Sequence, residues 1–195
     1  MKIGVDIDSV LCELTAPLMW RVNNKYGTNL TRDDIKEWNW KFDLNGYHID
    51  GYSEIKEALD DYFFALNLPA IDGGKEMLDF REFLGDEILL ITSRNKSRAP
   101  ATKEWVKRNI GNYEIKFTEG DKNGYDVDVL IDDAPHHTMD FAKKGKFTIL
   151  FDQPWNQGVE HPNILRIKSW DDLYLVWPLI ESWVGEHKLL TERFK

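Results

Sequence analysis

Residues 2–8 read Lys-Ile-Gly-Val-Asp-Ile-Asp, and apolar side chains alternate there with small or polar ones. A period of two is typical of a β-strand, in which successive side chains point to opposite faces. Asp6 and Asp8 are two residues apart and therefore point to the same side. An unpaired charge within such an apolar pattern is costly. The segment predicts a first strand that ends in a pair of functional carboxylates.

Two further apolar runs also end in polar side chains. The run at 87–93 ends in the hydroxyl residues Thr92 and Ser93, and a later run ends in Asp132 and Asp133. Ligands of an open parallel sheet bind beyond the carboxyl ends of its strands. These hydroxyls and carboxylates are therefore expected at one edge of a sheet.

Strand and helix patterns alternate along the rest of the chain. Strands are expected at 114–117, 146–151 and 164–167, and helices at 75–84, 98–109 and 171–183. Pro178 is expected to kink the last helix. This alternation predicts an α/β fold, a Rossmann-like parallel sheet with helices on both faces.

The stretch 14–72 departs from that alternation. It carries helical signals, such as the periodic run 54–66, but no convincing buried strand. We interpret it as a small helical cap, here called the cap segment, inserted after the first strand. The catalytic core is then formed by 1–13 and 73–195.

Composition and charge narrow the function classes. A net charge of −9 without clustered Lys and Arg disfavours a nucleic-acid polymer as partner. The apolar stretch 88–91 is far shorter than the roughly 18 residues of a membrane span. Cys12 is the only cysteine, which excludes an intrachain disulfide, and a cytoplasmic location is expected. A small anionic substrate such as a phosphomonoester is still compatible with the negative net charge, if a local group offsets that charge.

Acidic pairs at the ends of two strands indicate a metal site. Two like charges about 5 Å apart repel by roughly 3 kcal/mol at an effective dielectric near 20. Several carboxylates facing a phosphate therefore need a cation. An all-oxygen ligand set suits Mg²⁺, whereas no His or Cys accompanies these groups to favour zinc.

The order of these groups resembles a known superfamily. The motifs of the haloacid dehalogenase-like phosphatases are matched by Asp6-x-Asp8, Thr92-Ser93, Lys122 and Asp132-Asp133. More narrowly, the 5'(3')-deoxyribonucleotidase family is similar in Ile91-Thr92-Ser93-Arg94 and in a lysine ten residues before the second acidic pair. The resemblance is strong for the core motifs and weak across the cap segment.

The resemblance implies a role for each acidic residue. Asp6 attacks phosphorus and becomes an aspartyl phosphate. Asp8 protonates the leaving oxygen and then activates water. Mg²⁺ is held by Asp6, the backbone carbonyl of Asp8 and Asp133, and Asp132 supports them.

The resemblance also implies a phosphate site. Thr92, Ser93 and Lys122 bind the phosphate and offset developing charge. Ser9 departs from the family, which has Gly directly after the second Asp of the first motif. This difference removes no ligand but restricts the backbone beside the site.

Substrate contacts are expected from the cap segment and from the residue after the hydroxyl pair. Trp38 and Trp40, flanked by polar residues, are candidates to stack on a nucleobase, and Arg94 is a further candidate contact. His136 and His137 are expected in a surface loop or helix.

The function expected from the sequence is a Mg²⁺-dependent 5'-nucleotidase of small (deoxy)ribonucleoside monophosphates. Two alternatives stay open. One is a phosphatase of the same superfamily for a phosphosugar or another small metabolite. The other is a phosphoacceptor signalling domain, although such domains lack an insertion after the first strand.

Overall fold

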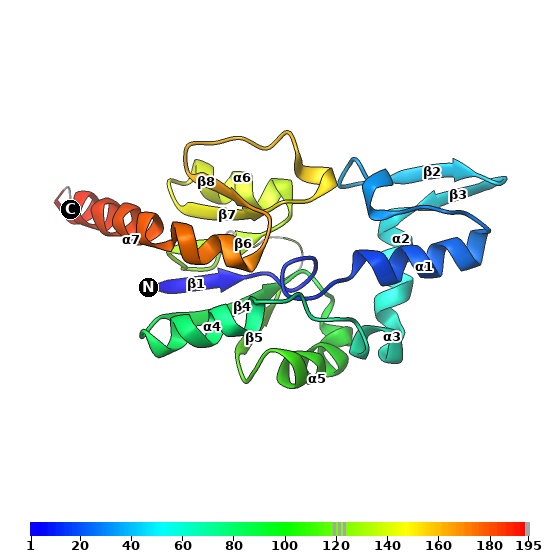
Figure 1. Ribbon diagram of the computed structural model, residues 1–195, viewed down its shortest axis with the longest axis horizontal. Helices are drawn as coiled ribbons and strands as arrows, with labels where there is room; N and C mark the ends of the chain where they lie inside the picture. Colours follow the sequence, from blue (N-terminus) through cyan, green and yellow to red (C-terminus); the bar gives the residue numbers. More distant parts are fainter. Residues whose placement is uncertain (119, 121, 123, 194–195) are drawn as a thin grey trace.

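A six-stranded parallel sheet forms the centre of the computed structural model, which describes residues 1–118, 120, 122 and 124–193. The strand order is β5-β4-β1-β6-β7-β8. The strands are β1 (Lys2–Val5), β4 (Glu87–Thr92), β5 (Glu114–Phe117), β6 (Val129–Asp132), β7 (Phe147–Phe151) and β8 (Ile164–Ile167). Every strand of this sheet lies within a segment where the sequence predicts one, and the expected α/β class is confirmed (Figure 1).

Helices cover both faces of this sheet. They are α4 (Gly74–Phe83), α5 (Ala99–Asn109), α6 (Pro135–Lys143) and α7 (Trp170–Arg193). Alternate side chains such as Leu90 and Ile131 pack in one cluster with residues of α4, α5 and α7. Their neighbours Ile91 and Leu130 pack instead with Phe141 of α6. Burial on both faces explains why these strands read as continuous apolar runs.

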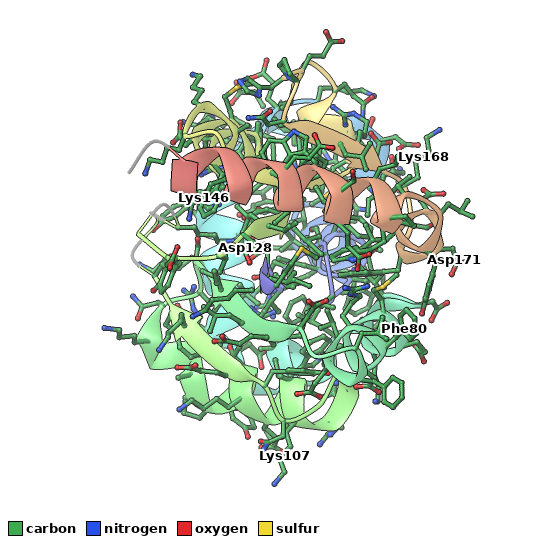
Figure 2. The ribbon with its side chains drawn as sticks, turned by 90° about the vertical axis from the view of Figure 1, so that its left-hand side faces the viewer. Phe80, Lys107, Asp128, Lys146, Lys168 and Asp171 are labelled. Carbon is green, nitrogen blue, oxygen red and sulfur yellow. The ribbon has the colours of Figure 1, made fainter. Side chains whose placement is uncertain are left out.

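Helix α7 is longer than the sequence predicts. It runs from Trp170 to Arg193 and continues through Pro178. Figure 2 views the molecule from the end opposite the cap segment and shows α7 at the front of this view. Within the described part of the chain, no helix has both the length and the apolar character that crossing a membrane requires.

The cap segment contains both helices and a β-hairpin. Its elements are α1 (Thr15–Tyr26), the short 3₁₀ helix η1 (Arg32–Asp34), β2 (Lys41–Leu44), β3 (Tyr47–Asp50), α2 (Gly51–Asp60) and α3 (Tyr62–Leu66). The hairpin was not expected. Its turn is Asn45-Gly46, and both residues have positive φ, as a two-residue hairpin turn requires. The helix expected at 54–66 is broken at Asp61, whose side chain caps α3.

The cap segment joins the core through two stretches of chain that lie side by side. Glu13 N donates to Pro69 O at 2.9 Å, and Ile71 N donates to Leu11 O at 2.8 Å. The strand arrow of β1 points towards the cap segment (Figure 1). The cap segment therefore lies over the carboxyl ends of the parallel strands.

Candidate active site

The chain turns sharply where β1 ends. Asp6 N still donates to Ile131 O of β6 at 2.9 Å, so the carboxylate of Asp6 is positioned by the sheet. Ser9 has a φ of 60°, in the left-handed region that a glycine adopts more easily. Gln153 Nε2 donates to Ser9 O at 3.0 Å and holds this conformation.

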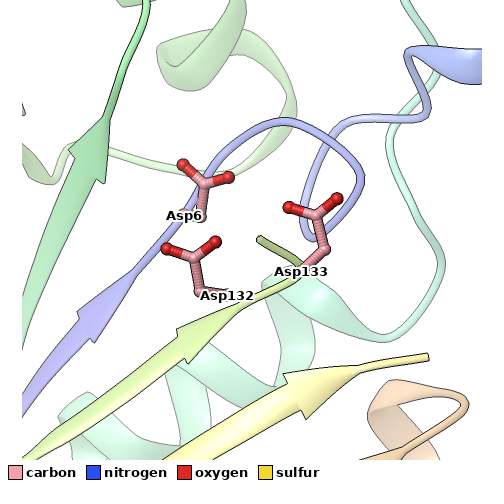
Figure 3. A group of neighbouring side chains, drawn as sticks. All are labelled: Asp6, Asp132 and Asp133. Atoms are coloured by element: carbon pink, nitrogen blue, oxygen red, sulfur yellow. The ribbon is translucent and has the colours of Figure 1, made fainter. Parts of the chain in front are cut away.

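Three carboxylates meet beyond the central strands. Asp6 follows β1, Asp132 ends β6, and Asp133 comes directly after it. One oxygen of each lies within 4.8 Å of the others (Figure 3). All three residues are buried. This carboxylate cluster arises because β1 and β6 are paired neighbours whose carboxyl ends lie together.

Lys122 is buried against this cluster. Its Nζ lies 2.5 Å from Asp6 Oδ1 and 2.9 Å from Asp132 Oδ2. Burial works to raise the pKa of Asp132, but the Lys122 ammonium and His137 together outweigh it and hold that pKa below its usual range. Asp132 also accepts from Ala134 N at 2.9 Å. Both carboxylate oxygens of Asp132 therefore already accept hydrogen bonds from other groups of the protein.

The negative charges of the other two carboxylates, those of Asp6 and Asp133, are not balanced by nearby positive charge. Burial raises the pKa of Asp6 to about 7 despite Lys122. Burial, followed by the charges of Asp6 and Asp132, raises the pKa of Asp133 well above its usual range. With Asp8, the site holds more carboxylates than the cations Lys122 and Arg94 balance. The oxygen-rich, negatively charged donor set fits a hard divalent cation.

The residues at the carboxyl end of β4 and directly after it have different environments. Thr92 is fully buried and its Oγ1 accepts from Arg94 N at 3.2 Å, whereas the Ser93 side chain is exposed. Arg94 was expected as a substrate contact. Its buried guanidinium instead pairs with Asp8, with Nη2 lying 2.7 Å from Oδ1. The structure therefore places the Arg94 guanidinium against Asp8 and within the core.

Comparison with known proteins identifies the family. A family described as "5' nucleotidase, deoxy (Pyrimidine), cytosolic type C protein" matches residues 1–180. The chain belongs to this family. It is thus a nucleotidase with phosphatase activity, and its substrate is a small nucleotide.

Relatives of this nucleotidase are distant in sequence and similar in fold. The 5'(3')-deoxyribonucleotidase of Bacillus subtilis is 24% identical over 177 residues, 88% of this chain and 95% of the relative. A nucleotidase-like protein of Oceanobacillus iheyensis is 28% identical over 189 residues, 88% of this chain and 96% of the relative. A haloacid dehalogenase family hydrolase of Deinococcus radiodurans, solved with phosphate and sodium, superposes with a TM-score of 0.60 at 14% identity, covering 92% of this chain and 96% of that one.

Several residues of the nucleotidase site were not assigned from the sequence. Trp155 Nε1 donates to Asp133 Oδ2 at 3.1 Å, and Asn156 Nδ2 donates to Asp133 O at 2.9 Å. Both lie in the 3₁₀ helix η3 (Pro154–Asn156) after β7. His137 was expected at the surface but is buried, and its Nε2 lies 2.7 Å from Gly120 O.

The two cap tryptophans have different environments. Trp38 is 41% exposed, and its ring packs edge-on against His136 of α6, with centroids 5.2 Å apart. Trp40 is 6% exposed and packs in the core of the cap segment. A Cβ added at Gly51 would lie only 2.3 Å from the Trp40 ring. Of the two stacking candidates, Trp38 alone keeps an accessible ring, and Trp40 packs the cap.

Proposed function

We propose that this protein is a Mg²⁺-dependent 5'-nucleotidase that hydrolyses (deoxy)ribonucleoside monophosphates through an aspartyl phosphate on Asp6. One observation carries the proposal. At the strand ends, below the cap segment, the Asp6 carboxylate lies beside the buried Lys122 and within the buried carboxylate cluster. The division into a core of 1–13 and 73–195 and a cap at 14–72 is part of this proposal, as is a cytoplasmic location.

The nucleophile is Asp6. An oxygen of its carboxylate attacks phosphorus, and the bond between phosphorus and the ester oxygen breaks. The leaving oxygen takes the proton of the Asp8 carboxyl and departs as the nucleoside. Water then attacks the phosphorus of the aspartyl phosphate and gives a proton to Asp8. Breakage of the bond to Asp6 releases inorganic phosphate and restores both carboxyl groups.

Mg²⁺ would be held by Asp6, the backbone carbonyl of Asp8 and Asp133. When bound, the ion supplies charge neutralisation for the phosphoryl oxygens. Asp132 is committed to Lys122 and Ala134 and therefore acts as a support. A hydrolase of the same fold from Bacillus subtilis, 14% identical with a TM-score of 0.55, has been solved with magnesium.

The phosphate would be bound by Thr92, Ser93 and Lys122. Lys122 supplies the cation, and Ser93 and the backbone after β4 supply donors at the exposed side of the strand end. Trp38 would stack on the base, since its exposed ring lies where the cap segment meets α6. The relatives named 5'(3')-deoxyribonucleotidase support a nucleotide with a deoxyribose.

A phosphate-release assay tests the proposal. Purified protein with Mg²⁺ should hydrolyse nucleoside monophosphates faster than sugar phosphates of equal charge. Replacing Asp6→Asn should lower kcat by at least about 10³-fold, because it removes the nucleophile. Asp126→Asn changes an exposed carboxylate and is the matched control. Equal rates on sugar phosphates would favour the metabolite phosphatase, and a stable acyl phosphate without turnover would favour a signalling domain.

A further inference from the structure

The buried guanidinium of Arg94 forms an ion pair with the Asp8 carboxylate on the core side of the site. Its Nε lies 3.2 Å from Oδ1 and 3.0 Å from Oδ2, and its Nη2 lies 2.7 Å from Oδ1. This is a forked contact, which fixes the plane of a carboxylate as well as its position.

The rest of the guanidinium is bonded within the core. Nη1 donates to Thr102 Oγ1 of α5 at 3.3 Å, and Nη2 also lies 3.6 Å from Cys12 Sγ. Arg94 is 3% exposed, and all three of its guanidinium nitrogens contact groups of the chain. These contacts use four of its five N–H donors, and little of the side chain is accessible to a phosphate.

We infer that Arg94 is a positioning residue that holds the Asp8 carboxyl in the orientation needed for proton transfer. The inference rests on the role proposed for Asp8 in the hydrolysis. In this role Arg94 does not contact the substrate and affects the rate only through Asp8.

The position of Asp8 explains why such support is useful. Its side chain is 23% exposed, whereas the Arg94 side chain below it is 1% exposed. Without the fork, the carboxyl would be free to rotate in the open site. Misplacement of a catalytic group by about 1 Å costs about 10²-fold in rate. Oδ1 receives two donors and Oδ2 receives one, so we assign proton transfer to Oδ2.

Leaving groups of different basicity test this role. The alkoxide of a nucleotide must be protonated as it leaves, whereas p-nitrophenolate leaves as a stable anion. For Arg94→Met, the first-turnover rate on a nucleoside monophosphate should fall about 100-fold. The initial burst of p-nitrophenolate should change by less than about 3-fold, and so should the substrate concentration that gives a half-maximal first-turnover rate on either substrate. Equal losses of the first-turnover rate on both substrates, or weaker substrate binding with the first-turnover rate intact, would overturn the inference.

A double-mutant cycle with Asp8→Asn gives a second measurement. If Arg94 acts through Asp8, adding Arg94→Met to Asp8→Asn should slow the enzyme no further. An additional loss of about 10-fold or more would mean that Arg94 acts independently. If Arg94→Met does not fold, Arg94→Lys serves in the same cycle, because it keeps the charge but loses the fork.

Arg81→Met is the matched control. Arg81 is 5% exposed and pairs with Asp86 and Glu181, away from the site. Arg81→Met should lower the stability of the protein but should change the rates on the nucleotide and on p-nitrophenyl phosphate by the same factor. A selective loss of the rate on the nucleotide in this variant would overturn the inference. If the wild type hydrolyses no nucleotide, the proposed function fails. Arg94 is then tested with whichever alkyl phosphate the protein does hydrolyse, against p-nitrophenyl phosphate.

Discussion

Trp155 Nε1 donates a hydrogen bond of 3.1 Å to Oδ2 of Asp133. The residue after Trp155 adds a second contact, because Asn156 Nδ2 donates to the Asp133 carbonyl at 2.9 Å. Both donors come from η3, which follows β7, and β7 pairs with β6. One strand end thus orients the carboxylate that the neighbouring strand end supplies.

Loss of the indole donor should weaken metal binding. Trp155→Phe keeps an aromatic ring but removes the hydrogen bond that orients Asp133. We expect the Mg²⁺ concentration for half-maximal activity to rise about 10-fold, the size typical for a partner of a ligating side chain. A Mg²⁺ titration of activity measures this. Trp177→Phe is the control, because it removes an indole donor to Glu181 on α7. An unchanged Mg²⁺ requirement in Trp155→Phe would count against Asp133 as a ligand.

Lys122 should stabilise the folded protein as well as its site. Lys122→Met leaves the buried carboxylates of Asp6 and Asp132 without their shared cation. Breaking a buried ion pair in this way costs about 3 kcal/mol, and Mg²⁺ should recover part of it by binding the folded state. Urea unfolding with EDTA and with Mg²⁺ measures both effects. Lys116→Met, which removes an exposed pair with Glu114, should cost under about 1 kcal/mol. A Mg²⁺-independent loss would show that no cation shares this cluster.

The sequence was most informative about the sheet and the strand ends. The four central strands are buried on both faces, and such strands are visible in the sequence as apolar runs. The meeting of Asp6 with Asp132 was predictable, because parallel strands bring their carboxyl ends to one edge. Lys122 lies in a loop and was expected beside them from the order of the motifs alone. The Asn45-Gly46 turn of the hairpin was also a local signal, but the sequence interpretation missed it.

Contacts between distant parts of the chain were not predictable. Gln153 bonds Ser9 across 144 positions, and nothing near either residue indicates the other. Arg94 follows a recognisable motif, but its long side chain can reach either the substrate or Asp8. In the folded protein, its contacts with Asp8, Cys12 and Thr102 turn it inward. Long side chains at a site therefore need the tertiary structure for their assignment.

Ser9 should tolerate glycine better than it tolerates a β-branched residue. Its φ of 60° costs an ordinary L-residue roughly 1–2 kcal/mol, and a branched Cβ adds to that cost. We expect Ser9→Gly to retain activity and stability within about 1 kcal/mol, and Ser9→Val to lose about 2 kcal/mol. Thermal unfolding and kcat measure the pair. Equal stability of the two variants would contradict a left-handed backbone at this position.

Trp38 should govern affinity for the base without affecting the chemistry. Stacking of one base on an aromatic ring contributes about 1–3 kcal/mol, so Trp38→Ala should raise KM for a nucleoside monophosphate about 10-fold or more. KM for p-nitrophenyl phosphate, which lacks a nucleobase, should change less. Trp40→Ala is the contrasting variant, because its buried ring packs against Phe42 in the cap segment. It should lower the stability by about 3 kcal/mol and affect both substrates alike. If Trp38→Ala raised both KM values equally, base recognition would have to be assigned to other residues of the cap segment.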